Sequence, residues 1–144
     1  IPGASAFPQF ITNRSEQFEA RLVMVEIAAS ASILFNGMQA SKIPVVVAHA
    51  EGRVNFTDPN DAQAAAVAMR YLDHAGEVTE RYPYNPNGSR DGIAGVTSDD
   101  GRVTLIMPHP ERVFRSVQMS WHPAHWQEDS PWIRLFRNAR VWLD

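Results

Sequence analysis

The sequence predicts a mixed α/β or α+β domain in which strands outnumber helices. Several short runs rich in β-branched and aromatic residues indicate strands, and two longer segments carry helix signals. The chain has 144 residues, of which 44% are hydrophobic, so it is long enough for one domain with a buried core. No internal repeat or low-complexity segment divides it.

The first half of the chain is predicted to be mostly strand. Residues 7–28 form two apolar runs, which the polar cluster at residues 13–16 separates. Residues 32–38 predict a short helical turn that Gly37 closes. Three consecutive valines at residues 45–47 indicate a buried strand, and strand character resumes at residues 53–56.

Residues 58–72 carry the clearest early helix signals. Asp58 suits an N-cap and Pro59 suits the first turn. The segment that follows, DAQAAAVAMRYL, is rich in alanine, which has the highest helix propensity. Residues 82–92 are rich in proline, asparagine and glycine, so we expect a long loop there.

The last third predicts a hairpin and a terminal helix. The runs IAGVTS and VTLIMPH flank the turn DDGR, a pattern typical of paired strands. Residues 115–129 are irregular and aromatic. Ser130 suits an N-cap and Pro131 the first helical position. The apolar face of this helix is predicted to comprise Trp132, Ile133, Leu135, Phe136, Ala139, Val141 and Trp142.

Composition argues against several classes of function. The net charge is −3, from 13 basic and 16 acidic residues without a basic cluster, so we expect no nucleic-acid partner. No apolar run approaches the roughly 18 residues of a membrane span, so we expect no membrane partner. The absence of cysteine excludes disulfides and zinc–thiolate sites, and a cytoplasmic location is expected.

His109 and Glu111 form the first candidate for chemistry. Residues two apart in an extended segment point to the same side, and Pro110 between them restricts the backbone. A carboxylate that binds one imidazole nitrogen fixes the tautomer and raises the basicity of the other nitrogen. The pair therefore suits the general base of a serine or cysteine nucleophile. The alternative is a strand end with an exposed histidine and a Glu111–Arg112 ion pair.

His49 and Glu51 repeat this spacing after another apolar run. Because open α/β sheets place their sites at the carboxyl ends of strands, the two histidines are candidates to share one cleft. The alternative is a surface loop in which Glu51 pairs with Arg53.

A metal site is the third candidate. His122 and His125 are the closest pair of histidines, but Pro123 lies between them and no helix aligns them, so we expect no metal. His74 is expected to be solvated in a turn. The tryptophans Trp121, Trp126 and Trp132 lack interleaved basic residues, so they are expected to cover a core or meet a partner rather than stack on bases.

Several stretches, in order along the chain, resemble one family. The segment GIAGVTSDDGRVTLIMPHPERVFR resembles the C-terminal end of the glutamine amidotransferase domain of phosphoribosylformylglycinamidine synthase. NRSEQFEAR resembles the segment shortly after the nucleophile of that family. IPVVVAHAEGRV is similar to its His-Gly-Glu-Gly strand end, with Ala50 in place of the first glycine. YPYNPNGS also matches the family, and WHPAHWQEDSPWIRLFRNARVWL is similar to the closing segment of the large single-chain bacterial type.

The resemblance implies a class I glutamine amidotransferase-like (flavodoxin-like) fold and a Cys-His-Glu triad. By position, His109 is the general base and Glu111 orients it. The cysteine of the family lies in an upstream strand-to-helix turn. Residues 1–144 would then be the C-terminal portion of the domain, truncated at its N-terminal side, without the part that bears the nucleophile.

The resemblance also implies a ligase that hydrolyses glutamine and supplies ammonia for the ATP-dependent amination of formylglycinamide ribonucleotide in purine biosynthesis. Its partners would be glutamine and the rest of the same polypeptide. ATP and Mg²⁺ would bind a synthetase region outside these residues, and we expect no cofactor in this chain. Asn13, Ser15 and His49 are expected glutamine contacts, with turn caps and a strand terminus as their structural alternatives.

Two other functions stay open at this point. One is a non-catalytic, partner-binding module of the same fold. The other is a small metal-binding protein with an ion at His122 and His125. If the enzyme interpretation holds, the chain alone is expected to be inactive as a glutaminase, because it lacks the cysteine.

Overall fold

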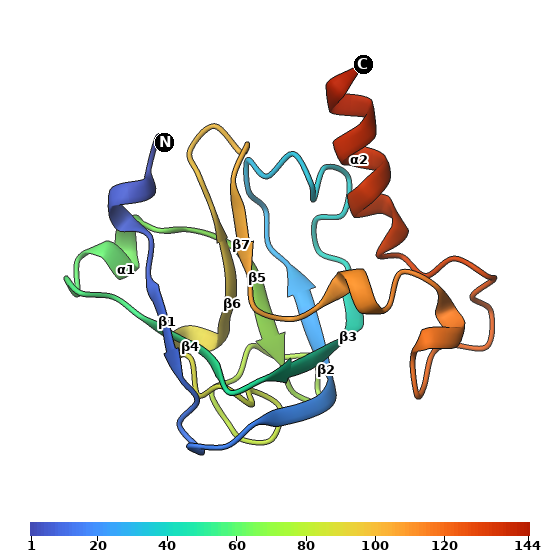
Figure 1. The fold of residues 1–144 in the computed structure, drawn as a ribbon, viewed down its shortest axis with the longest axis horizontal. Helices are drawn as coiled ribbons and strands as arrows, with labels where there is room; N and C mark the ends of the chain where they lie inside the picture. The colour runs from blue at the N-terminus through green and yellow to red at the C-terminus, as the bar shows by residue number, and fades with distance from the viewer.

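Strands dominate the computed structural model, which describes residues 1–144 (Figure 1). A five-stranded antiparallel sheet has the order β3-β2-β5-β6-β7, and β1 and β4 form a separate two-stranded ribbon. The strands are β1 (Gln9–Thr12), β2 (Glu19–Ile27), β3 (Lys42–His49), β4 (Glu51–Asn55), β5 (Ala66–Leu72), β6 (Ile93–Thr97) and β7 (Thr104–Ile106). The helices are α1 (Asp61–Ala64), α2 (Ile133–Leu143) and the 3-10 turns η1 (Ala4–Ala6), η2 (Arg90–Gly92), η3 (Pro110–Arg112) and η4 (Ser116–Gln118).

The core lies against the β2–β3 pair. Val23 pairs with Val45, and Val25 pairs with Ile43, and all four side chains are buried. Phe35 and Met38, from the turn that follows β2, and Trp132 and Leu135, from the C-terminal segment, complete this cluster. The apolar runs that predicted the first strands and the turn near Gly37 thus correspond to observed elements.

The prediction of a helix over residues 58–72 is wrong. Only Asp61–Ala64 are helical, and Ala66–Leu72 form strand β5. β5 lies between β2 and β6 and pairs with both, so its backbone groups bond to neighbouring strands. Both faces of β5 are largely covered, so its sequence lacks the alternation of apolar and polar residues that marks a half-exposed strand. The small alanine side chains fit between the neighbouring layers. Tertiary packing has therefore overridden helix propensity.

The C-terminal helix is confirmed, but only part of its apolar face is covered. The helix begins at Ile133 with Trp132 as its N-cap, so the predicted cap at Ser130 and first helical position at Pro131 lie two residues too early. The Ser130 hydroxyl accepts a hydrogen bond from the Trp132 amide at 3.2 Å in the turn that precedes the helix. Trp132 is fully buried, whereas Val141 and Trp142 are 73% and 55% exposed. Figure 1 shows the end of α2 projecting away from the sheet. None of the helices combines the length and the hydrophobicity that crossing a lipid bilayer requires.

The predicted hairpin is confirmed as β6 and β7, and the chain beyond it closes the sheet. Met107 donates its amide hydrogen to Ala94 O at 3.1 Å, and His109 then donates to Val46 O at 2.8 Å. β7 and β3 are the two edges of the strand order, so the segment after β7 crosses from one edge to the other. The sheet is therefore curled, and residues 109–111 lie beside the end of β3.

Replacement of Trp132 by phenylalanine should destabilise the fold. Trp132 Nε1 donates to Pro44 O at 2.7 Å, and the substitution leaves that buried carbonyl without a partner. We expect a loss of about 1–3 kcal/mol in the free energy of unfolding, measured by urea denaturation. The control is Trp142→Phe at an exposed position, which should change it by less than about 0.5 kcal/mol. Equal effects of the two substitutions would contradict the packing described here.

Candidate active site

His109 and Glu111 form the predicted pair. His109 precedes η3, and its Nδ1 lies 2.8 Å from Glu111 Oε1. The side chains are 25% and 54% exposed, so the imidazole is reachable from outside the chain. Arg112 Nε also approaches Glu111 Oε1, at 3.7 Å. The ion pair that was the structural alternative thus coexists with the histidine contact, at a longer distance.

His49, at the end of β3, meets the other nitrogen of His109. His49 Nδ1 lies 3.3 Å from His109 Nε2, with the ring centroids 5.4 Å apart. The two histidines, which the sequence offered as candidates to share one cleft, are therefore in direct contact. They meet because the chain after β7 returns to β3 in a curled antiparallel sheet.

Two asparagines continue the contacts inward. Asn87 Nδ2 lies 2.8 Å from His49 Nε2 and donates to Asn13 Oδ1 at 2.7 Å. Asn13 Nδ2 in turn donates to His49 O at 2.9 Å and to Gln17 O at 3.0 Å. Asn13 and Asn87 are 1% and 0% exposed. We call the five connected side chains the relay: Asn13, Asn87, His49, His109 and Glu111.

Tyr71 anchors the inner end of the relay. Its hydroxyl donates to Asn87 Oδ1, and its ring belongs to the main core. Burial raises the pKa of Tyr71 far above its ordinary range, so the hydroxyl stays a neutral donor. The core and the relay are therefore joined through β5.

Burial also sets the charge of His49. Desolvation lowers the pKa of His49, the hydrogen bond with Asn87 opposes this effect, and the nearby His109 lowers the pKa further. His49 is therefore neutral at pH 7.

Glu51 does not repeat the role of Glu111. Its side chain is exposed and makes no hydrogen bond or ion pair, including the predicted pair with Arg53. Gly52, the next residue, is buried directly against the relay. A Cβ at this position would overlap His49 Nε2 and lie 2.5 Å from Asn87 Nδ2. The absence of a side chain at residue 52 is thus a requirement of the His49–Asn87 contact.

The three residues expected to contact glutamine do not all lie together in the structure. Asn13 and His49 lie in the relay, whereas the Ser15 hydroxyl donates to Glu19 Oε1 at 2.6 Å, outside the relay. Glu19 also binds Arg21. The role of Ser15 as a substrate contact stays a prediction. The sequence analysis does not identify Asn87 as a site residue, although Asn87 lies in the stretch NPNGS that resembles the family.

No group of three or more histidine, aspartate or glutamate side chains is arranged to hold a metal ion. His122 Nδ1 instead lies 3.0 Å from Pro123 O, and the His122 ring stacks on Trp126 with centroids 6.2 Å apart.

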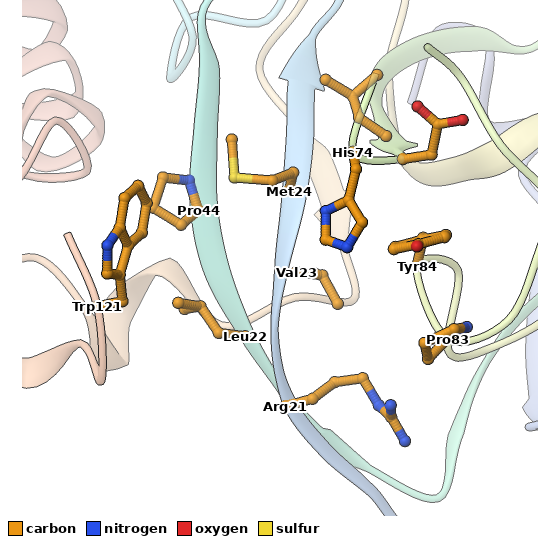
Figure 2. A pocket seen from close by; sticks show the side chains of 11 residues that line it. Arg21, Leu22, Val23, Met24, Pro44, His74, Pro83, Tyr84 and Trp121 are labelled. Atoms are coloured by element: carbon orange, nitrogen blue, oxygen red, sulfur yellow. The ribbon is translucent and has the colours of Figure 1, made fainter. Parts of the chain in front are cut away.

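A hollow lined largely by apolar side chains lies away from the relay. It has a volume of about 440 Å³ and lies over β2, with Trp121 on one side and His74 and Tyr84 on the other (Figure 2). His74 is exposed in a turn, as predicted, and packs edge-on against Tyr84 with centroids 4.6 Å apart. None of the residues that line this hollow belongs to the relay, so the hollow and the relay are separate features of the surface.

Comparison with known proteins identifies the family and the fold of the chain. Residues 1–143 match the family described as the CobB/CobQ-like glutamine amidotransferase domain. The structure is similar to that of PurLQS from Thermotoga maritima, with a TM-score of 0.69 and 24% sequence identity. The match covers 95% of this chain and 53% of the solved chain, so this chain spans about half the length of that relative. The likeness confirms the predicted class I glutamine amidotransferase-like fold.

His49 should make the stability of the chain depend on pH. An unfolded histidine has a pKa of about 6.5, and folding lowers the pKa of His49. As the pH falls below about 6.5, the unfolded chain gains a proton before the folded chain does. The contribution of His49 to stability is therefore complete above this pH and is lost as the pH falls toward the folded pKa.

Substitution of His49 by asparagine should flatten the slope of unfolding free energy against pH below about pH 6.5. Urea denaturation at several pH values measures this slope. His125→Gln is the control, because His125 is exposed and contacts no member of the relay. An unchanged slope in the His49 variant would show that His49 does not titrate differently on folding.

Proposed function

The chain belongs to the family of CobB/CobQ-like glutamine amidotransferase domains, and on that premise we propose that it carries the His-Glu part of a glutaminase site. The site would release ammonia from glutamine for the ATP-dependent amination of formylglycinamide ribonucleotide in purine biosynthesis. The enzyme would be the phosphoribosylformylglycinamidine synthase of the large single-chain bacterial type, with this chain near its C-terminal end. The motif resemblance along residues 13–143 supports this assignment.

One observation carries the proposal. His109 Nδ1 is bound to Glu111 Oε1 at 2.8 Å, which leaves Nε2 as the basic nitrogen. This arrangement corresponds to two members of a Cys-His-Glu triad, the general base and the carboxylate that orients it. The side chain of His109 is 25% exposed, so a thiol from another segment can reach it.

The proposed reaction begins when His109 Nε2 accepts the proton of a cysteine thiol. The thiolate attacks the side-chain amide carbon of glutamine, and a tetrahedral intermediate forms. His109 returns the proton to the departing nitrogen, so ammonia leaves and a thioester remains. Water, activated by the same nitrogen, then attacks the thioester, and glutamate and the thiol are released.

The sequence contains no cysteine, so the proposal requires a thiol from polypeptide outside these 144 residues. ATP and Mg²⁺ would bind the synthetase region, which is also outside them. Asn13 and His49 would act through the relay, and Ser15 would contact glutamine.

The chain by itself should release no ammonia from glutamine above the rate without protein. Its base has no thiol to deprotonate. A coupled glutamate dehydrogenase assay on the purified chain measures this rate. Ammonia release that His109→Ala abolishes would show that the chain carries a complete glutaminase and would contradict the proposal.

In the complete polypeptide, His109→Ala should lower glutamine-dependent turnover by about 10²- to 10⁴-fold, the usual contribution of a positioned base. Glu111→Gln should have a smaller effect in the same direction, because the ring loses its charged partner. Turnover with added ammonium salt should stay unchanged in both variants, since ammonia bypasses the glutaminase step. If both variants keep full glutamine-dependent turnover, the chain is a partner-binding module of the same fold instead.

A further inference from the structure

We propose that His49 is a positioning residue that holds the His109 ring with its Nε2 lone pair presented for the nucleophile. His49 would donate Nδ1–H to His109 Nε2, with its own tautomer set by Asn87 and Asn13. The inference rests on the proposed function, in which His109 is the general base. It assigns to His49 a role other than the glutamine contact expected from the sequence.

The inner end of the relay determines the direction of every donor. The carbonyls of His49 and Gln17 can only accept, so the atom of Asn13 that faces them is the amide nitrogen. Asn13 Oδ1 then needs a donor, and Asn87 Nδ2 supplies it at 2.7 Å. The same amide group faces His49 Nε2 at 2.8 Å, so His49 Nε2 is an acceptor. A neutral His49 must therefore carry its hydrogen on Nδ1.

The Glu111 end of the relay independently gives the same direction for these hydrogen bonds. An ionised Glu111 can only accept, so His109 carries a hydrogen on Nδ1. In a neutral His109, Nε2 is then a lone pair, and it faces the Nδ1–H of His49. All hydrogen bonds along the line from Asn87 to Glu111 thus point toward the carboxylate, without a conflict between donors.

The link between the two histidines is the longest of the line. It measures 3.3 Å, whereas the other links from Asn13 to Glu111 measure 2.7–2.8 Å. A hydrogen bond of this length is weak, so a thiol can replace His49 at His109 Nε2 without breaking the remaining contacts. His49 therefore holds the His109 ring in place until a thiol takes its position at Nε2.

Two buried residues, Tyr71 and Gly52, hold Asn87 in its contact with His49. Tyr71 donates its hydroxyl hydrogen to Asn87 Oδ1, which fixes the orientation of that amide. Gly52 leaves the space that the His49–Asn87 contact occupies. The other charged group beside His49 is Glu19, its register partner in β2, whose carboxylate is already bound by Ser15 and Arg21.

The tautomers can be measured directly by ¹⁵N NMR of labelled histidine rings in the chain at pH 7. His49 should carry its hydrogen on Nδ1, and so should His109. Asn87→Asp replaces the amide donor by an acceptor, so the hydrogen of His49 should move to Nε2. Gly52→Ala, which crowds the same contact, should also change the His49 signals, and exposed Glu51→Gln should change neither ring. A wild-type His49 with its hydrogen on Nε2, or one that does not respond to Asn87→Asp, would overturn the inference.

Kinetics in the complete polypeptide separate positioning from substrate contact. His49→Phe should lower the glutamine-dependent kcat by about 10- to 100-fold, as removal of such supporting partners usually does, with little change in KM for glutamine. His49→Asn keeps a donor and should restore most of kcat. Ammonia-dependent turnover should stay constant. A raised KM with unchanged kcat would overturn the inference in favour of direct glutamine contact.

The two proposals fail in different ways. Loss of turnover in His109→Ala without any kinetic effect in His49→Phe would remove the role of His49 and leave the proposed glutaminase intact. Full turnover in His109→Ala would instead remove the glutaminase, and with it the catalytic reason for the relay.

Discussion

The hydrogen bond from His109 N to Val46 O, 2.8 Å long, is the interaction on which the site depends. β3 and β7 are opposite edges of the five-stranded sheet, and the site takes His49 from the end of β3 and His109 from the segment after β7. This bond brings the segment after β7 against β3, which places the His109 ring within 3.3 Å of the His49 ring. The arrangement of the two histidines is therefore a consequence of how the sheet curls, and not only of a local His-Pro-Glu turn.

The relay couples that chemistry to the core. Tyr71 packs within the main hydrophobic cluster and holds Asn87 by its hydroxyl. Asn13 is anchored to two backbone carbonyls, so the inner end of the relay cannot shift without disturbing the sheet. Fully satisfied buried polar groups of this kind restrict a site to one arrangement, which is what a general base requires.

Local signals predicted the elements whose neighbours in sequence are also their neighbours in space. The β6–β7 hairpin, the existence of the helix α2 and the His109–Glu111 pair are of this kind. Residues 66–72 were predicted as a helix, because alanine content is a local property and burial between two strands is not. Asn87 was missed as a site residue for the same reason: its partners are 16 to 74 positions away along the chain. The convergence of His49 on His109 was proposed from strand ends, while the curled antiparallel route to it was visible only in three dimensions.

The central claim is that His109 Nε2 receives a proton from a cysteine outside these 144 residues. A crystal structure of the complete polypeptide with bound glutamine tests this claim most directly. The account predicts a cysteine Sγ within hydrogen-bonding distance of His109 Nε2, with His109 Nδ1 still bound to Glu111 and His49 still bound to Asn87. A structure in which glutamine is bound and no thiol lies near His109 would contradict the account.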